Sequence, residues 1–239
     1  MPLGSSNHAV VYRYSIDVSD VMPIGIDKDG KPTALFTKWD AKGDKLVKDF
    51  TKVFSEAWKS TPEQKRWLEK AVSSGLSIPS LYLEKTDKVY FLHGDSYLRC
   101  TLATQSVDEG FPKAISSYWP GLKAAGFDRG IDAALWWDEK TAYLFKGLEY
   151  VRYNLETDKV DEGFPKSIAS YWPGFKEAGF GSGIDAIVRW DDEWAYAFKG
   201  DKYIRFHIPT NKVDQAPKKT TDYWKALAEV GSQRVLAIF

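Results

Sequence analysis

The chain of 239 residues is long enough for one large all-β domain or for two small domains. Its 33 Lys and Arg balance its 33 Asp and Glu, so it lacks the basic excess with which proteins neutralise nucleic-acid phosphates. No stretch approaches the roughly 18 uninterrupted apolar residues of a membrane span, so neither nucleic acid nor membrane is an expected partner. The first residues, MPLGSSNH, hold no apolar core of a secretory signal, and the sequence predicts a cytoplasmic protein.

Aromatic residues make up 15% of the chain and favour sheets, because large flat side chains pack well on a pleated surface. Cys100 is the only cysteine, so no intrachain disulfide can form. No local motif offers Cys100 a catalytic base, and we interpret it as a small buried hydrophobic residue. The fold therefore has to be closed by means other than a disulfide.

Two strands are predicted near the start of the chain, at residues 8–15 (HAVVYRYS) and 33–40 (TALFTKWD). The stretch 16–32 between them follows no repeat. Within it, residues 27–30 (DKDG) resemble part of a calcium-binding loop but lack the downstream Glu that such a loop needs. We therefore predict a hairpin turn there.

A helix is predicted over residues 61–74. The segment begins with a Ser/Thr-Pro-Glu start signal, and Gly75 is a typical stop. Its apolar residues share one helical face: Trp67, Leu68, Ala71 and Val72. We interpret the segment as a helix that caps the fold, with a partner-binding or dimer surface as the alternative.

The rest of the chain is a repeat with a period of 53 residues. Residues 107–127 (VDEGFPKAISSYWPGLKAAGF) recur as residues 160–180 (VDEGFPKSIASYWPGFKEAGF), and a weaker copy follows at 213–231. The same period relates four sets of upstream positions: Tyr90, Tyr143 and Tyr196; Gly94, Gly147 and Gly200; Tyr97, Tyr150 and Tyr203; Arg99, Arg152 and Arg205. Chance does not bring so many positions into register, so the chain contains three copies of one structural unit.

The sequence of each unit predicts three short strands followed by a short helix. In the middle copy the strands are expected at 131–136, 142–147 and 150–155, where apolar, β-branched and aromatic residues cluster between turn signals. Pro165 opens the helical stretch, and a Pro-Gly pair ends it. Such a unit is typical of a propeller blade, which buries its two apolar faces only by stacking on neighbours.

We predict an all-β, four-bladed β-propeller with short helices between the blades. The C-terminal RVLAIF (234–239) follows Gly-Ser as a first strand does in the repeat, but no blade comes after it. This strand is expected to pair into blade one and close the ring by hydrogen bonds. The single domain 1–239 then divides as follows: blade one, 8–76 plus 233–239; blade two, 77–129; blade three, 130–182; blade four, 183–232.

The runs GIDAA, YLFKG, YVRY, DEGFPKSI and WPG resemble hemopexin repeats. The resemblance covers residues 77–231 strongly and the first 76 residues weakly. It implies a hemopexin-like propeller, and a free-standing one is similar to plant seed albumins of the pea albumin 2 type and to bacterial photopexins. Most extracellular members join blades one and four by a disulfide, so a chain without one is expected to close by strand pairing or to work in a reducing compartment.

The resemblance also implies an ion in the axial channel, held by backbone carbonyls at the starts of the innermost strands. The matching positions are Asp132 and Asp185, with Pro79 in a corresponding but altered place; in blade one the match lies at Val235 or Leu236, and we take Leu236. Oxygen-only coordination suits calcium or sodium as a structural cofactor. The two Asp side chains are expected to hydrogen-bond nearby backbone rather than to form an acid–base pair.

The three histidines do not predict a haem site. His8, His93 and His207 break the repeat at different positions, so its symmetry does not bring them together as paired ligands. The chain also contains no HExxH motif, no serine elbow and no phosphate loop. The recurring Arg residues are expected to form ion pairs or to pack through their stems on the outer part of each blade.

The tryptophans divide into two groups. Trp119, Trp172 and Trp224 recur and are predicted to lie in the core. Others do not recur as a set and are candidates for the lining of a ligand pocket: Trp39, Trp136, Trp137, Trp190 and Trp194.

The sequence favours a binding protein over a conventional enzyme. The first hypothesis is a propeller that binds a small molecule, such as a polyamine or a haem-like compound, at one mouth of a channel that holds a structural cation. The alternative is a cofactor-free cyclase or isomerase that orients its substrate in an aromatic pocket. A second alternative is a protein-interaction or toxin module, which large exposed aromatic patches would favour. A homodimer is compatible with each.

Overall fold

The structure, a computed structural model, describes residues 18–26, 32–40, 45–46, 52–53, 56–74, 77–224 and 234–238. The strands before residue 56 and the strand after residue 224 are described by their backbone pairing. Across the described residues, no helix combines the length and the apolar character needed to cross a membrane.

Three antiparallel sheets in the repeat region share one strand order, in which three strands pair in sequence and two very short strands pair with the third. The first sheet consists of β5 (Ser80–Leu83), β6 (Lys88–His93), β7 (Ser96–Thr101), β8 (Ser106–Val107) and β9 (Lys113–Ala114). The second consists of β10 (Ala133–Asp138), β11 (Thr141–Lys146), β12 (Glu149–Asn154), β13 (Lys159–Val160) and β14 (Lys166–Ser167). The third consists of β15 (Ala186–Arg189), β16 (Trp194–Lys199), β17 (Lys202–His207), β18 (Lys212–Val213) and β19 (Lys218–Lys219). The prediction of an all-β fold is confirmed.

The helices are few and mostly short. The long one is α1 (Pro62–Ser73), and each repeat carries one of four residues: α2 (Ile115–Tyr118), α3 (Ile168–Tyr171) and α4 (Thr220–Tyr223). A 3₁₀ turn, η3 (Glu84–Thr86), lies between β5 and β6.

A further sheet contains strands from both halves of the chain. The strand β20 (Arg234–Ile238) pairs antiparallel with β1 (Val18–Ile26), which pairs with β2 (Pro32–Asp40). Two short strands, β3 (Lys45–Leu46) and β4 (Lys52–Val53), both pair with β2. The last strand of the chain therefore lies beside a strand from its beginning.

This sheet also contains a strand that the sequence did not predict. β1 falls in the stretch interpreted as non-repeating, whereas the predicted strand at 8–15 and the predicted turn at 27–30 lie outside the described residues. Pro23 and Gly25 lower the strand propensity of β1. Pairing with β2 and β20 on its two edges outweighs this propensity, and the register shift between Met22 and Pro23 is the kind of irregularity at which sheets accept proline.

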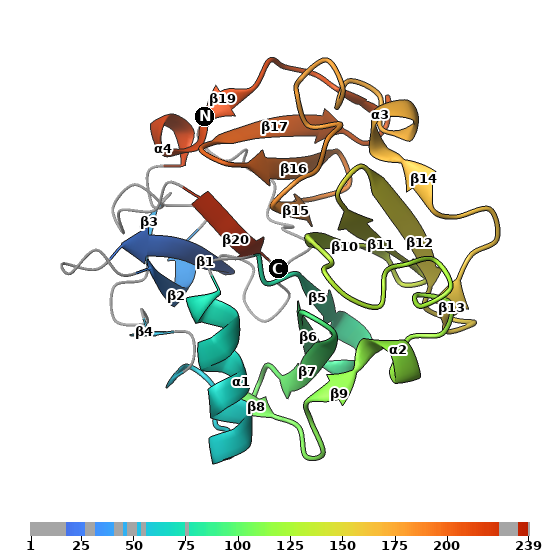
Figure 1. Cartoon of the computed structure of the whole chain (residues 1–239). Coiled ribbons are helices and arrows are strands. Elements are labelled where there is room, and N and C mark those ends of the chain that lie inside the picture. The colour runs from blue at the N-terminus through green and yellow to red at the C-terminus, as the bar shows by residue number, and fades with distance from the viewer. Residues whose placement is uncertain are drawn as a thin grey trace.

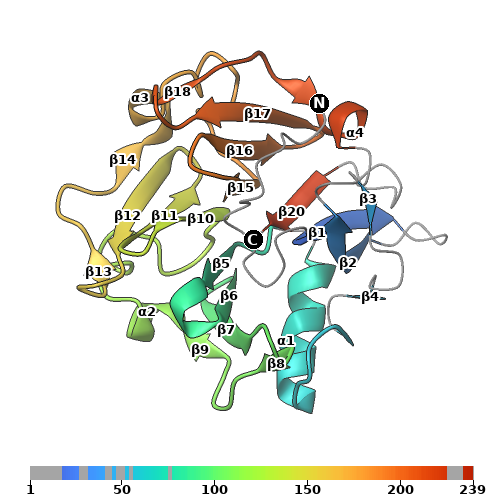
Figure 2. The same cartoon turned by 180° about the vertical axis from the view of Figure 1, so that it is seen from behind.

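The sheets are arranged around a common centre. The innermost strands are β5, β10, β15 and β20, and the later strands of each sheet lie farther out (Figure 1). β10 lies beside both β5 and β15, and β15 lies beside β20. The view from behind shows the same radial arrangement (Figure 2).

The recurring tryptophans pack between neighbouring sheets. Trp172 is 5% exposed, and its ring centroid lies 5.3 Å from that of Phe145 in its own sheet and 5.3 Å from that of Phe206 in the next sheet. Trp119 likewise contacts Tyr97 in its own sheet and Tyr153 in the next one. The prediction that these residues form the core is confirmed, and their burial joins each sheet to its successor.

The loops after Trp119 and Trp172 bind the next sheet through their backbone. The carbonyl of Pro120 accepts a hydrogen bond from the amide of Val160 at 3.2 Å, and the carbonyl of Pro173 accepts one from Val213 at 3.0 Å. Gly174 has a φ of +89°, and a Cβ atom there would lie 2.7 Å from the Cβ of Val213. The Pro-Gly pair thus ends the helix and also lets the loop approach its neighbour closely.

The recurring arginines form ion pairs in all three sheets, as predicted. The pairs are Arg99 with Asp108, Arg152 with Asp161, and Arg205 with Asp214. Burial alone would raise the pKa of the Asp108 carboxyl, but hydrogen bonds from Lys88, Thr101 and Arg99 lower this pKa below its ordinary value.

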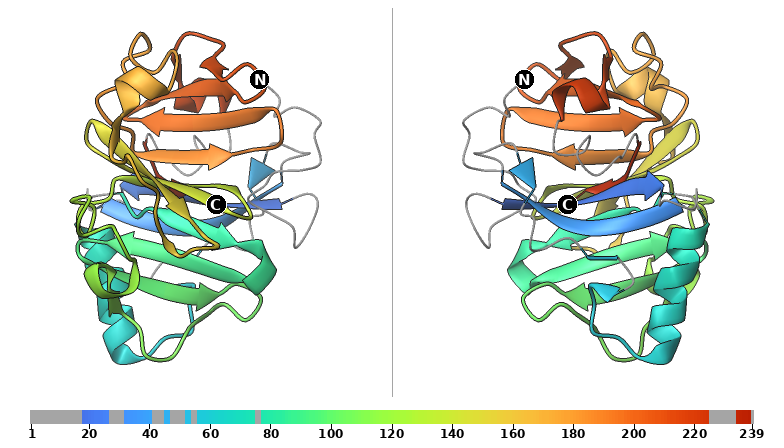
Figure 3. Two further views of the ribbon diagram at one scale, coloured as in Figure 1. Left: turned by 90° about the vertical axis from the view of Figure 1, so that its right-hand side faces the viewer. Right: turned by 90° about the vertical axis from the view of Figure 1, so that its left-hand side faces the viewer.

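Helix α1 packs on the first sheet of the repeat, and the side views show it crossing the ends of the strands on one flank (Figure 3). Thr61 and Gln64 form a capping box at its start. Leu68 and Ala71 are 0% exposed, and Trp67 and Val72 are partly buried against the same core. The apolar face of α1 is therefore covered by its own chain, which agrees with the capping interpretation.

Candidate functional site

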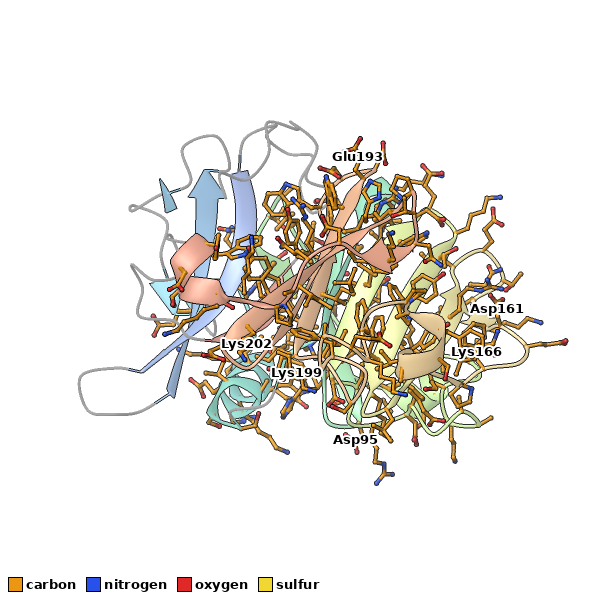
Figure 4. All side chains as sticks on the ribbon, turned by 90° about the horizontal axis from the view of Figure 1, so that it is seen from above. Asp95, Asp161, Lys166, Glu193, Lys199 and Lys202 are labelled. Atoms are coloured by element: carbon orange, nitrogen blue, oxygen red, sulfur yellow. The ribbon has the colours of Figure 1, made fainter. Side chains whose placement is uncertain are left out.

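The two ends of the innermost strands carry different chemistry. Asp95 and Lys199 lie at one end of the molecule and Glu193 lies at the opposite end (Figure 4). We call the first end the glycine-turn face, because it holds the tight turns at Gly94, Gly147 and Gly200, and the second end the acidic face, which comprises loops 84–87, 138–140 and 190–193. Of the predicted ion-binding residues, Asp132, Asp185 and Pro79 lie near the glycine-turn face.

Asp132 and Asp185 each organise a glycine turn. Oδ2 of Asp132 accepts a hydrogen bond from the amide of Gly147 at 2.6 Å, and Oδ2 of Asp185 accepts one from Gly200 at 2.7 Å. The backbone amides of the two Asp residues donate to the second strand, to the carbonyls of Phe145 and Phe198. The prediction that these side chains bind local backbone is confirmed, since each carboxylate joins the start of an inner strand to the turn of its own sheet.

Neighbouring sheets meet through the same turns. The amide of Gly130 donates to the carbonyl of Gly94 at 2.9 Å, and Gly183 approaches the carbonyl oxygen of Gly147 so closely that a Cβ atom would lie 3.2 Å from it. Lys146 donates across the sheet boundary to the carbonyl of Gly126 at 2.6 Å. Lys199 does the same to the carbonyl of Gly179 at 2.9 Å. The starts of β10 and β15 are therefore fixed both by their own sheet and by the preceding one.

Pro79 does not take the place of Asp132 in the strand pairing. Tyr90 lies opposite Leu81, whereas its counterpart Tyr143 lies opposite Leu135, so β5 is shifted by one residue. The carbonyl of Pro79 accepts a hydrogen bond from the amide of Leu92 at 2.9 Å and is thus part of the ladder. A proline has no amide hydrogen to donate, so it cannot repeat the backbone bond that Asp132 makes.

Leu236 lies at an irregular point of β20. Met22 is paired with Ala237 and Pro23 with Val235, so Leu236 falls at the register shift between them. Bulges of this kind leave one residue out of the ladder. Leu236 therefore differs from Val235, which keeps a partner across the sheet.

A cation at the axis would depend on backbone oxygens. Within the parts of the chain that the structure describes, no group of three or more His, Cys, Asp or Glu residues is arranged to hold a metal ion. The starts of β10 and β15 instead present carbonyl groups in a fixed arrangement. Such hard oxygen donors fit calcium or sodium better than a transition metal.

The acidic face gathers negative charge around the axis. The acidic residues in the sequence of its three loops are Glu84, Asp87, Asp138, Glu139, Asp191, Asp192 and Glu193, against Lys85 and Lys140. Lys85 pairs with Glu139 across the boundary between two sheets at 2.5 Å. Asp192 pairs with Arg189 at 2.9 Å while its side chain stays 93% exposed. Asp191 is buried and accepts the amides of Glu193 and Trp194, so it shapes its loop.

Sequence reasoning missed this cluster although the signal was present. The segments DEK at 138–140 and DDE at 191–193 occupy the first hairpin of successive repeat units. Reading the charges of equivalent hairpins together would have placed them at one end of the axis, because equivalent turns of stacked repeats meet at the same face.

The candidate pocket tryptophans have separate surroundings. Trp190 is 2% exposed and packs on Trp224 and Tyr196, so it belongs to the core. Trp194 is covered by the guanidinium of Arg205, whose Cζ lies 4.0 Å from the ring centroid, and by the ring of His207 at 4.5 Å.

The other three tryptophans lie elsewhere. Trp137 packs on Trp172 and Tyr143, with Arg189 over its ring. Trp136 is half-buried on β10, and Trp39 lies opposite Leu46 in the β2–β3 pair. Trp137, Trp190 and Trp194 thus pack on different neighbours, and these three rings do not define one aromatic pocket.

The remaining titratable candidates are also dispersed. His93 contacts Trp67 of α1, and His207 contacts Trp194 and Thr210, so the two lie in different sheets; His8 lies outside the described residues. Cys100 is 0% exposed, and burial raises the pKa of its thiol, which agrees with its interpretation as a buried hydrophobic residue.

Comparison with known proteins places this arrangement among relatives. Albumin-2 of Pisum sativum is 36% identical over 122 residues, which cover 48% of this chain and 53% of the albumin. The chain thus spans about half the length of the seed albumins it matches. Two crystal structures share the fold: the hemopexin fold protein CP4 from cow pea (TM-score 0.66, 21% identity, covering 83% of this chain and 92% of CP4) and a plant lectin with two metal binding sites from Cicer arietinum (TM-score 0.65, 24% identity, covering 87% of this chain and 97% of the lectin).

The family model described as Hemopexin matches residues 81–124, 131–177 and 184–228. These segments coincide with the three repeated sheets, and together they make up more than half of the chain. The chain belongs to the hemopexin family.

Proposed function

We propose that the chain is a small-molecule-binding hemopexin-like protein with a structural cation in its axial channel and a cationic ligand at its acidic face. The domain spans 1–239 as one four-bladed propeller, with β20 as the strand that closes the ring in blade one. The pairing of β20 with β1 and its position beside β15 support this closure.

The cation is assigned to the glycine-turn end of the inner strands. Asp132 and Asp185 would contribute backbone carbonyls, and Leu236 is the proposed position in blade one. In blade two the proposed position, Pro79, is not equivalent to Asp132, because β5 is shifted and the Pro79 carbonyl already accepts the amide of Leu92. The starts of β10 and β15 are held both by their own sheet and by the preceding one, which supports this assignment. Oxygen ligands bind an ion well when their positions are fixed. A bound ion would stiffen the hub and would need no catalytic role.

The observation that carries the ligand proposal is the excess of carboxylates in loops 84–87, 138–140 and 190–193. A ring of like charge over a low-dielectric hub focuses its field along the axis and attracts cations. A polyamine such as spermine offers several ammonium groups to such a ring. A haem-like compound carries carboxylates of its own, so the same field disfavours it.

A cofactor-free enzyme is less well supported by the same residues. That alternative needs aromatic side chains that converge on one substrate, and the candidate tryptophans instead pack on separate neighbours. The exposed large apolar side chains Tyr118, Leu148 and Tyr171 belong to α2, to the turn between β11 and β12, and to α3, respectively. We therefore place the ligand at the acidic face.

Thermal unfolding with spermine, haem and calcium tests this proposal. At a hundredfold excess over Kd, a ligand adds about 2.7 kcal/mol to the free energy of unfolding. For a chain of this size that corresponds to a rise of roughly 5–10 °C in Tm. We expect spermine to raise Tm, haem to leave it unchanged, and a calcium chelator to lower it if the axial ion is calcium.

A pair of double variants localises the ligand. Asp192→Asn with Glu193→Gln removes two charges from the acidic face and should weaken spermine binding several-fold in titration calorimetry. Glu149→Gln with Asp201→Asn removes the same charge from exposed positions at the glycine-turn face and should leave the affinity unchanged. Equal weakening by both doubles, or no binding of spermine to the unaltered chain, would refute a site at the acidic face.

A further inference from the structure

Helix α1 is attached to the first repeated sheet by a small number of specific contacts. Nε2 of Gln64 donates to the carbonyls of Asp108 at 2.9 Å and Phe111 at 3.3 Å. Nε1 of Trp67 donates to Oγ of Ser96 at 2.9 Å. Leu68 and Ala71, farther along the helix, have fully buried side chains. Release of α1 would therefore uncover apolar surface and leave the carbonyls of Asp108 and Phe111 without this donor.

The sheet under α1 departs from the repeat at the residue that Trp67 touches. His93 ends β6, where β11 ends in Lys146 and β16 ends in Lys199. Each lysine ammonium reaches a backbone carbonyl of the preceding loop, Gly126 or Gly179. His93 instead meets the ring of Trp67 edge to face, with centroids 5.9 Å apart and planes at 90°. A permanent cation has thus been replaced by a titratable ring at the place where the helix docks.

Two charged groups act on His93 in the docked state. Lys70, in the last turn of α1, opposes a positive imidazole, and Asp95, in the turn after β6, favours one. Burial, to which the ring of Trp67 contributes, is the largest effect, followed by Lys70, and together they lower the pKa of His93 below its ordinary value against the smaller opposite effect of Asp95. When α1 leaves, the ring returns to water and Lys70 moves away with the helix, so both causes disappear.

We propose that α1 is a pH-sensitive latch, held on the β5–β9 sheet while His93 is neutral and loosened when His93 takes up a proton. The undocked state binds the proton more readily than the docked state, so the docked fraction falls as pH falls from the ordinary histidine range, near pH 6.5, towards the lower pKa of the docked state. Within this window the ratio of docked to undocked helix changes by up to about tenfold for each pH unit, since one proton is taken up on release.

Hydrogen exchange on the whole chain tests the latch. The readout is the protection of the α1 amides from residue 65 onward, corrected for the intrinsic pH dependence of exchange, between pH 8 and pH 5. We expect protection of these amides to fall several-fold on acidification, while the amides of β11 and β16 keep theirs.

Three variants make the test specific. His93→Gln keeps a polar side chain that does not titrate, and the acid-induced loss of protection should disappear. His93→Lys installs the cation found in the other two sheets, and α1 should be poorly protected already at pH 8. His207→Gln alters a half-buried histidine at the end of a strand in another sheet and should behave as the unaltered chain does.

The proposal is overturned if the His93→Gln chain loses α1 protection on acidification as the unaltered chain does, because the proton would then act elsewhere. It is equally overturned if protection of α1 in the unaltered chain stays constant or rises between pH 8 and pH 5, as a favourable contact of a protonated His93 with the Trp67 ring would produce.

Discussion

The β10–β14 sheet and the β5–β9 sheet are copies of the same repeat. Of these two, only the β10–β14 sheet makes both repeated hydrogen bonds at the glycine-turn face. In the β10–β14 sheet, Asp132 binds the turn at Gly147 and Lys146 reaches back to the preceding loop at Gly126. In the β5–β9 sheet the equivalent positions are Pro79 and His93, and β5 is shifted by one residue against β6.

Both differences lie where the sheet meets the segment that precedes it in the chain. The loop before the β10–β14 sheet is a copy of the repeat, whereas the segment before the β5–β9 sheet contains α1, which is three times as long as each repeat helix. A lysine at position 93 would meet Trp67 of α1 rather than a repeat carbonyl. Where the repeated neighbour is absent, the repeated contact is absent too. The Arg99–Asp108 pair, which lies within the β5–β9 sheet, and the contact of Trp119 with the following sheet are kept.

The largest effect is expected from a feature that both sheets retain. Trp172→Ala removes a fully packed ring between two sheets and should lower the free energy of unfolding by about 3–5 kcal/mol, as for other large aromatic truncations. Urea unfolding followed by circular dichroism measures it. Trp136→Ala, at a half-buried position outside the recurring set, serves as the control and should lose distinctly less; equal losses would mean that recurrence does not mark the core.

A smaller effect is expected where the loop approaches the next sheet. Gly174→Ala combines a left-handed backbone with a Cβ 2.7 Å from Val213 and should cost about 1–3 kcal/mol more than Gly179→Ala. Gly179 has a similar φ of +79° but open space around it, so it isolates the backbone contribution. Indistinguishable Tm values for the two variants would contradict the close approach.

The hydrogen bond between Asp132 and Gly147, which the β5–β9 sheet lacks, should contribute still less to the free energy of unfolding. Asp132→Ala leaves the amide of Gly147 without its acceptor and should cost about 1 kcal/mol, measured by urea unfolding. Pro79→Asp should not bring a matching gain to the β5–β9 sheet, because the register of β5 does not place residue 79 at the turn. A gain of the same size from Pro79→Asp would show that the register shift has no consequence.

The smallest effect concerns acid stability. The lowered pKa of Asp108 means that its ion pairs stabilise the chain above the ordinary aspartate pKa near 3.9 and that this contribution is lost as pH falls through the lower pKa of the folded state. Asp108→Asn should therefore lose about 1 kcal/mol or less at pH 6, and its deficit should shrink towards pH 2. A deficit that persists unchanged at pH 2 would point to lost hydrogen bonds rather than to charge.

The candidate sites were predicted from the sequence to different extents. The Asp132 and Asp185 positions could be read from the repeat, because the same side chain recurs at the same point of two units and makes the same bond. The aromatic pocket could not, because the sequence does not show which neighbours a tryptophan packs on, and Trp190 is buried against Trp224 in the core. The acidic face was overlooked because its residues lie far apart in sequence and meet only when the hairpins of stacked units share one end.

The sequence by itself determined the repeating unit: its strands, its short helices, its buried tryptophans and its Arg–Asp pairs, because each depends on local periodicity or on contacts that recur with the period. It also determined α1, whose cap and apolar face are local patterns. Only the tertiary structure decided β1, the register of β5 and the gathering of carboxylates at one face. These depend on hydrogen bonds and charges between segments that are distant along the chain, and propensity and spacing within one segment carry no information about such neighbours.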